Sequence, residues 1–305
     1  MSENFSLNKY NIYLFLFSLL FIFISGYLNI TIFLEASSDG FYSQVTYVVR
    51  NINNPSEYSP LFIVHSLRLI IILPFYIAYS LNLPSYVESI IFIMYLLPFF
   101  KSNDLAIKIS SIILLFLPLV FSYRTVLGMV GMGYLYLCLF YYKGRYLLLF
   151  TSALLANLSS GIVFGWLFSI FTSIKYIKNN YPKFLVFIII MILGFIGSFL
   201  HKYQFMISDV GAMKNGSFWE RSTLYESYQN NYYSKFIVYT SVVMAILVIL
   251  TYPIYKQQKL GRKWLFFLGA LPLVLFEGVG LISYLFCIIV VILSSNNDIY
   301  QKQSI

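Results

Sequence analysis

Long apolar runs recur along this chain, and they constrain its fold more than any other feature. A helix needs about 20 mainly apolar residues to cross the hydrocarbon core of a bilayer. Runs of this kind lie at 11–34, 60–81, 86–100, 105–122, 124–142, 146–174, 183–201, 235–255 and 264–294. Charged residues make up only 10% of the chain, whereas soluble domains carry about 25%. The sequence therefore predicts an all-α, polytopic integral membrane protein with about nine to eleven transmembrane or re-entrant helices.

Two polar stretches, 35–59 and 202–234, are the longest interruptions of these runs. We expect residues 1–305 to form a single membrane domain in which these stretches are loops. The strongest basic clusters are Lys143–Arg145, Lys175–Lys178 with Lys183, and Lys256–Lys263. Basic clusters next to spans face the cytoplasm, so the two loops face the periplasm or exterior. The net charge of +9 then reflects topology and attraction to a lipid bilayer, and not a nucleic-acid partner.

This topology makes two predictions about individual segments. Because 146–174 begins and ends at cytoplasmic clusters, we expect a helical hairpin that turns near Asn157–Gly161. Between the first loop and Lys143 the sequence offers four apolar segments, although an odd number of crossings is required. We expect Pro60–Leu73 to be a short membrane-surface helix that ends at Pro74.

Charged residues inside apolar segments are costly, and they mark candidate sites. Arg124 lies nineteen residues before Lys143, about 28 Å along a helix, which places it at the outer end of its segment. It either reaches outer lipid phosphates or binds an anionic substrate. His65 and Arg68 are spaced i, i+3 and share one helix face, so they either hold a phosphate or dip into lipid headgroups.

Polar and small residues elsewhere suggest further roles. Glu277 lies in an apolar segment and is either a general base or a residue at a helix end that reaches water. The loop 216–226 mixes aromatic and charged side chains, which favours carbohydrate binding or an interfacial aromatic belt. Gly128, Gly131 and Gly133 are predicted to form a close-packing face. The two cysteines lie in apolar segments, and no metal-binding or cofactor motif is present.

Three stretches together resemble the bacterial O-antigen and exopolysaccharide repeat-unit polymerases of the Wzy and EpsG type. Ser38–Tyr42 with Tyr47 resembles a motif of the family's first outer loop, although here the glycine follows the aspartate. Tyr123–Arg124, followed by a helix rich in small residues, resembles the family's arginine helix, with Thr125 in place of its glutamine. Leu155–Ser159 stands where the family has a histidine motif, with Asn157 nearest to that histidine.

The resemblance implies a GT-C-like bundle that joins undecaprenyl-pyrophosphate-linked oligosaccharide repeat units at the outer face of the inner membrane, as an inverting, metal-independent glycosyltransferase without cofactor. The product would be O-antigen, capsule or exopolysaccharide, and a chain-length regulator protein is an implied partner. Candidates for binding the pyrophosphate are Arg124, Arg68, His65 and Arg221. Candidates for the catalytic carboxylate are Asp39, Glu220 and Glu277. Candidates for binding sugar are Tyr42, Trp219, Tyr225 and Asn157.

Two other functions remain open at the level of the sequence. One is a GT-C glycosyltransferase that uses a polyprenyl-monophosphate sugar donor, in which Glu35 or Asp39 would be the acidic residue of the first outer loop. The other is a lipid-linked sugar transporter or flippase. Transporters often contain internal repeats with paired broken helices, and the sequence shows no convincing repeat.

Overall fold

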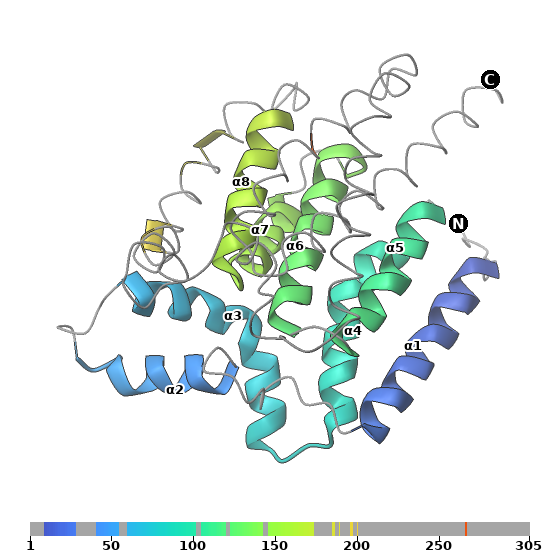
Figure 1. The fold of residues 1–305 in the computed structure, drawn as a ribbon, viewed down its shortest axis with the longest axis horizontal. Coiled ribbons are helices and arrows are strands. Elements are labelled where there is room, and N and C mark those ends of the chain that lie inside the picture. Colours follow the sequence, from blue (N-terminus) through green and yellow to red (C-terminus); the bar gives the residue numbers. More distant parts are fainter. Residues whose placement is uncertain are drawn as a thin grey trace, which may run out of the picture.

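The computed structural model describes residues 9–28, 41–54, 60–101, 105–119, 123–142 and 146–173, with isolated positions at 185–186, 189, 196–197, 200 and 266. Regular structure within these residues is entirely helical, so the all-α prediction is confirmed for this part of the chain. The helices are α1 (Lys9–Tyr27), α2 (Phe41–Asn51), α3 (Pro60–Ser80), α4 (Ser85–Phe100), α5 (Leu105–Phe116), the short 3-10 helix η2 (Leu117–Leu119), α6 (Tyr123–Phe140), α7 (Tyr146–Ala156) and α8 (Ser160–Ser173) (Figure 1).

The apolar runs predicted most of these helices. Each of the first six runs begins within two residues of a helix start in the structure. The runs 183–201, 235–255 and 264–294 lie outside the described residues, apart from isolated positions. Two described helices are long and apolar enough to cross a membrane, namely Phe62–Ser80 within α3 and Tyr123–Phe140, which is α6.

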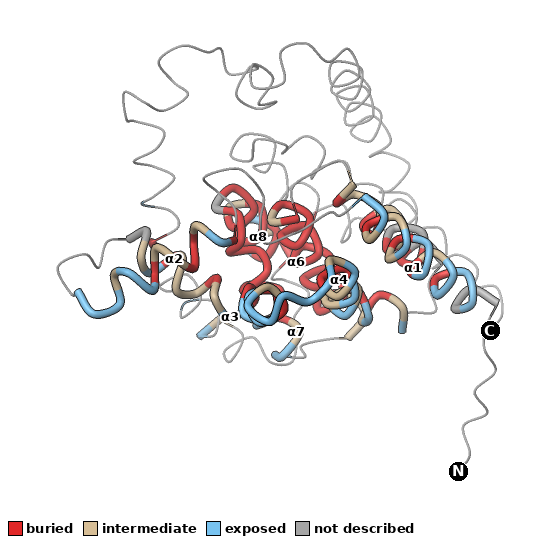
Figure 2. The backbone as a smooth tube through the Cα atoms, turned by 90° about the horizontal axis from the view of Figure 1, so that it is seen from below, coloured by how far each residue is buried: buried red, intermediate tan, exposed pale blue. Residues whose placement is uncertain are grey.

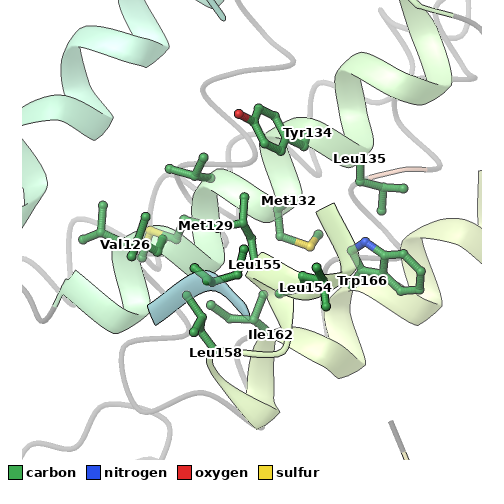
Figure 3. Packing of buried hydrophobic residues seen from close by; sticks show 14 of the residues in the cluster. Val126, Met129, Met132, Tyr134, Leu135, Leu154, Leu155, Leu158, Ile162 and Trp166 are labelled. Atoms are coloured by element: carbon green, nitrogen blue, oxygen red, sulfur yellow. The ribbon is translucent and has the colours of Figure 1, made fainter. Parts of the chain in front are cut away.

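Helix α6 lies at the centre of the packing. Of its 18 residues, all except Arg124 and Phe140 are buried, and Figure 2 shows the buried residues concentrated in α6 and its neighbours. Side chains of α7 and α8, among them Leu155, Ile162 and Trp166, gather on α6 (Figure 3). The core of the described part is therefore built around one apolar helix that is covered on several sides.

The glycines of α6 permit this close approach, as the sequence predicts. A Cβ atom on Gly131 would lie 2.7 Å from the backbone nitrogen of Ala156 and 2.8 Å from the carbonyl oxygen of Ser152, both on α7. A Cβ on Gly133 would instead collide with the ring of Phe99 on α4. With Gly128 against Ile162 of α8, the glycines lie against three neighbouring helices and do not form one face.

A chain of buried hydrogen bonds joins α8, α7 and α6 at the same place. The indole Nε1 of Trp166 donates to the hydroxyl of Ser152 at 2.7 Å, and that hydroxyl donates to the carbonyl oxygen of Gly131 at 2.7 Å. Trp166 and Ser152 are fully buried. Because buried polar groups are costly without partners, these bonds favour one register of the three helices.

The segment 146–174 forms two helices, as predicted, and the turn between them spans Asn157–Ser159. This turn is buried, with Asn157 and Leu158 at 0% exposure. Its backbone N–H groups donate to carbonyl oxygens of α7, for example Asn157 to Ala153 at 3.0 Å. Buried backbone groups need such partners, and the last turn of α7 supplies them.

The predicted helix end at Pro74 is wrong. α3 continues through Pro74 to Ser80 as one helix, and Figure 1 shows that it bends between a first arm beside α2 and a second arm that descends toward the start of α4. A proline inside a helix removes one hydrogen bond and crowds the carbonyl four residues earlier, which produces a kink. Ile72 and Phe75 are fully buried on either side of Pro74, so packing holds the helix together through the bend.

Candidate functional site

The most distinctive polar cluster of the described residues is centred on Arg68 of α3. Only 4% of Arg68 is exposed. Its Nε donates to the backbone carbonyl oxygen of Asn157 at 2.7 Å, and its Nη1 makes a longer contact of 3.4 Å with the side-chain oxygen of Gln44 on α2. The guanidinium therefore connects α2, α3 and the α7–α8 turn, which are far apart in the sequence.

The position of Arg68 follows from two local features. Gln44 lies on the buried face of α2, together with Phe41, Val45 and Val48, a spacing of i, i+3, i+4 and i+7 that forms one helix face. The carbonyl of Asn157 directly follows the last residue of α7, where a helix leaves carbonyl groups without intrahelical partners and carries a partial negative charge. A cation such as Arg68 is stabilised at such a helix end.

His65 lies one helical turn before Arg68 and also faces α2. Its ring meets the ring of Tyr47 edge to face, with centroids 5.5 Å apart and an interplanar angle of 71°. The shared face predicted from the i, i+3 spacing is therefore turned toward α2. His65 is half-buried and Arg68 is buried, so the arginine is enclosed by helices instead of lying on an outer surface.

Arg124 is the second residue of α6 and is half-buried. The preceding Tyr123 is buried, and its ring packs edge to face on Phe92 of α4 with centroids 5.4 Å apart. Gly128, about 6 Å further along α6, lies against Leu155 and Ile162, which flank the α7–α8 turn. The start of α6 with Arg124 and the turn contacted by Arg68 therefore lie at the same end of the α6–α7–α8 group.

A pocket of about 250 Å³ opens between α2 and the end of α3. Its walls carry three tyrosines and an arginine, and Tyr42 meets Tyr79 edge to face with centroids 5.9 Å apart. The lining residues are Tyr42, Val45, Thr46, Val49, Arg50, Tyr76, Tyr79 and Ser80. Of these, only Tyr42 was a candidate from the sequence.

The structure thus brings Arg68, His65 and Asn157 into one neighbourhood and places Tyr42 in a nearby pocket. The remaining candidates, Asp39, Glu220, Glu277, Arg221, Trp219 and Tyr225, lie outside the described residues. Within the described part, no three His, Cys, Asp or Glu side chains come together as a metal site would require.

Sequence reasoning missed Gln44, Arg50, Tyr76 and Tyr79. The stretch 35–59 was interpreted as a loop, although Phe41, Val45 and Val48 already follow helical spacing. This pattern was the available signal for an amphipathic helix. No signal within the sequence pairs that helix with Arg68.

Comparison with known proteins adds no relative: no family model, curated protein or solved structure matches this chain.

Proposed function

We propose that this chain is a polytopic polymerase of the bacterial inner membrane, which joins undecaprenyl-pyrophosphate-linked oligosaccharide repeat units into a surface polysaccharide. The observation that carries the proposal is Arg68, a buried arginine held by Asn157 and Gln44 beside the buried α7–α8 turn. A buried arginine beside a broken helix is expected where an anionic group must be bound within a bundle. The resemblance of the chain to the Wzy and EpsG type suggests that this anion is the lipid-linked pyrophosphate.

The surface of α1 supports a lipid environment. This helix buries a narrow stripe, Leu14, Ser18, Phe21 and Ser25, at i, i+4, i+7 and i+11. Large apolar side chains cover the rest of it, namely Ile12, Tyr13, Phe15, Leu16, Leu19, Leu20 and Phe23. A continuous apolar surface of this kind is unfavourable in water and favourable in a bilayer.

The α7–α8 pair supports the proposed topology. Helix α7 has 11 residues and is about 16 Å long, roughly half the thickness of the hydrocarbon core. With Lys143 at the cytoplasmic surface, the turn at Asn157 lies inside the bundle, where irregular backbone is tolerated because protein surrounds it. Arg124 then lies toward the outer side, where a GT-C-like enzyme works, and the Arg68 cluster lies deeper in the bundle, beside this turn.

In the proposed reaction, a hydroxyl at the non-reducing end of an incoming repeat unit attacks the anomeric carbon of the growing chain. The bond from that carbon to the lipid pyrophosphate breaks, and the pyrophosphate leaves with the bonding electron pair. Arg68 and Arg124 stabilise the charge that develops on it. The hydroxyl proton passes to a carboxylate, for which Asp39, Glu220 and Glu277 are the candidates.

A deletion strain tests this function directly. We expect a gel of its surface polysaccharide to lose the long-chain ladder and to retain a single repeat unit on the lipid core, and complementation with the wild-type chain to restore the ladder. An unchanged ladder contradicts the proposal. Loss of the single repeat unit as well indicates an earlier step, such as transport of the lipid-linked unit.

Arg124→Lys is expected to shorten or abolish the long-chain polysaccharide in the complemented strain. Lysine keeps the positive charge but cannot form the two parallel hydrogen bonds that a guanidinium makes to a phosphate. The measurement is the ladder on the gel, together with the amount of protein in the membrane fraction. Lys101→Gln, which removes an exposed charge at the end of α4, is the control and should leave the ladder intact. A ladder of near wild-type length from Arg124→Lys means that Arg124 contributes charge alone.

A further inference from the structure

The pocket between α2 and α3 lies beside the second arm of α3, which follows Pro74. The first arm of α3 lies along α2, where Arg68 reaches Gln44 and His65 meets Tyr47. The second arm passes the start of α2, where Phe75 meets Phe41 and Tyr79 meets Tyr42, and Figure 1 shows the corner that the two helices form. The pocket of about 250 Å³ lies in this corner, between one side of α2 and the last turns of α3. We refer to its eight lining residues, given above, as the corner pocket.

The walls of the corner pocket are aromatic. Tyr42 is 46% and Tyr76 is 37% exposed, so both present ring surface to a ligand. Tyr42 is held in place by its edge-to-face contact with Tyr79. Tyrosine offers a large contact area at a low cost in conformational entropy, because it has only two side-chain torsions.

The polar groups of the corner pocket favour an anion. Arg50 is exposed and is the charged residue among the eight that line it, and none of these eight described residues is a carboxylate. The hydroxyls of Thr46 and Ser80 donate to carbonyl oxygens of their own helices, Tyr42 and Ile77, both at 3.0 Å. The guanidinium is therefore the main polar recognition element, and it matches the planar geometry of a carboxylate.

We propose that the corner pocket binds an acidic sugar residue of a glycan, with the sugar ring against the tyrosine faces and its carboxylate on Arg50. This assignment deepens the proposed function, on which it rests, because it names a class of repeat unit as the substrate. Sugar rings carry apolar C–H faces that pack on aromatic rings. Pockets for drug-sized ligands measure about 300–1,000 Å³, so a pocket of about 250 Å³ suits a single ring. An anionic lipid headgroup offers a similar charge to Arg50, and the change of lipid composition in the test below distinguishes the two occupants.

The test is a binding measurement on the full chain in phosphatidylcholine nanodiscs by isothermal titration. The probes are the acidic disaccharide cellobiouronic acid and its neutral counterpart cellobiose. We expect the acidic disaccharide to bind more tightly, and Arg50→Gln to weaken its binding about tenfold or more, as loss of a charge-assisted pair does. Tyr76→Leu should weaken both probes, since it removes the ring surface. Lys101→Gln removes an equal charge elsewhere and should change neither.

Three results would overturn the assignment. The first is that the wild-type chain binds both disaccharides equally tightly. The second is that the Arg50→Gln variant binds the acidic disaccharide as tightly as the wild-type chain does. The third is its complete displacement when phosphatidylglycerol replaces phosphatidylcholine, which would identify an anionic lipid as the occupant. The binding assay requires no turnover, so the acidic-sugar assignment can fail while the polysaccharide ladder depends on this protein as expected. Failure of the assignment and failure of the proposed polymerase function are therefore distinguishable.

Discussion

Arg68→Lys is expected to abolish the long-chain polysaccharide ladder while the protein remains folded in the membrane. The ammonium keeps the charge, but it cannot donate along both directions that the guanidinium uses toward Asn157 and Gln44. The loss of a hydrogen bond made by a charged group costs about 1.5–3 kcal/mol, which is too little to unfold a well-packed bundle. The misplaced cation would nevertheless no longer meet the leaving pyrophosphate.

The measurement combines the polysaccharide gel with size-exclusion chromatography of the detergent-solubilised protein, to confirm that the variant is folded. A full-length ladder from Arg68→Lys contradicts a role for the guanidinium in phosphate binding. If the lysine variant is lost from the membrane, Arg68→Met separates the cases. Methionine removes the buried charge and keeps a long side chain, at a cost of about 1–3 kcal/mol for each acceptor left without this donor. A folded methionine variant without a ladder supports the functional role, and one with a normal ladder assigns Arg68 to structure alone.

Among glycine-to-alanine substitutions in α6, Gly131→Ala is expected to give the largest loss of stability. The new Cβ would lie 2.7 Å from a backbone nitrogen and 2.8 Å from a backbone oxygen of α7, and backbone atoms cannot turn aside as a side chain can. The helices must separate, which also strains the hydrogen bond from Ser152 to the carbonyl of Gly131. Overpacking of this kind costs about 1–3 kcal/mol or more, and it exceeds the gain of about 0.5–1 kcal/mol that alanine brings to a helix.

Thermal unfolding of the solubilised protein measures this effect, and Gly26→Ala is the matched control. Gly26 also lies in a helix, α1, but among the residues that the structure describes a Cβ there would meet only the Cβ of Tyr86, at an ordinary contact distance of 3.7 Å. We expect Gly26→Ala to leave the unfolding temperature unchanged or slightly raised, and Gly131→Ala to lower it. Equal unfolding temperatures for the two variants would mean that α6 and α7 are not closely packed at Gly131.

The helices themselves were largely predictable. Long apolar runs predicted the starts of α1, α3, α4, α5, α6 and α7, because a helix in an apolar environment must satisfy its backbone within the segment. The hairpin at Asn157 was predicted from the basic clusters on either side of 146–174, since charge fixes which ends face the cytoplasm. The glycines of α6 predicted close packing but not the helices they contact.

The candidate site was less predictable, because its contacts join residues distant in the chain. Arg68 and Asn157 are separated by 89 positions and Arg68 and Gln44 by 24, and no local pattern pairs such residues. The helix α2 was missed because polar composition dominated the prediction for 35–59. Its apolar face is short and gains its stability from packing on α3.

Pro74 also shows a feature that the sequence alone does not predict and that packing decides. By itself a proline predicts the end of a helix, and the buried side chains on both sides of it instead hold α3 together as one bent helix.

The sequence by itself determined that the described part of this chain is helical and where most of its helices begin, because local apolar content and charge decide those features. Only the tertiary structure decided that Arg68 lies buried against the α7–α8 turn and that the corner pocket lies beside the second arm of α3, with Arg50 in its lining. Those features arise from packing between helices, and packing depends on which faces meet in space.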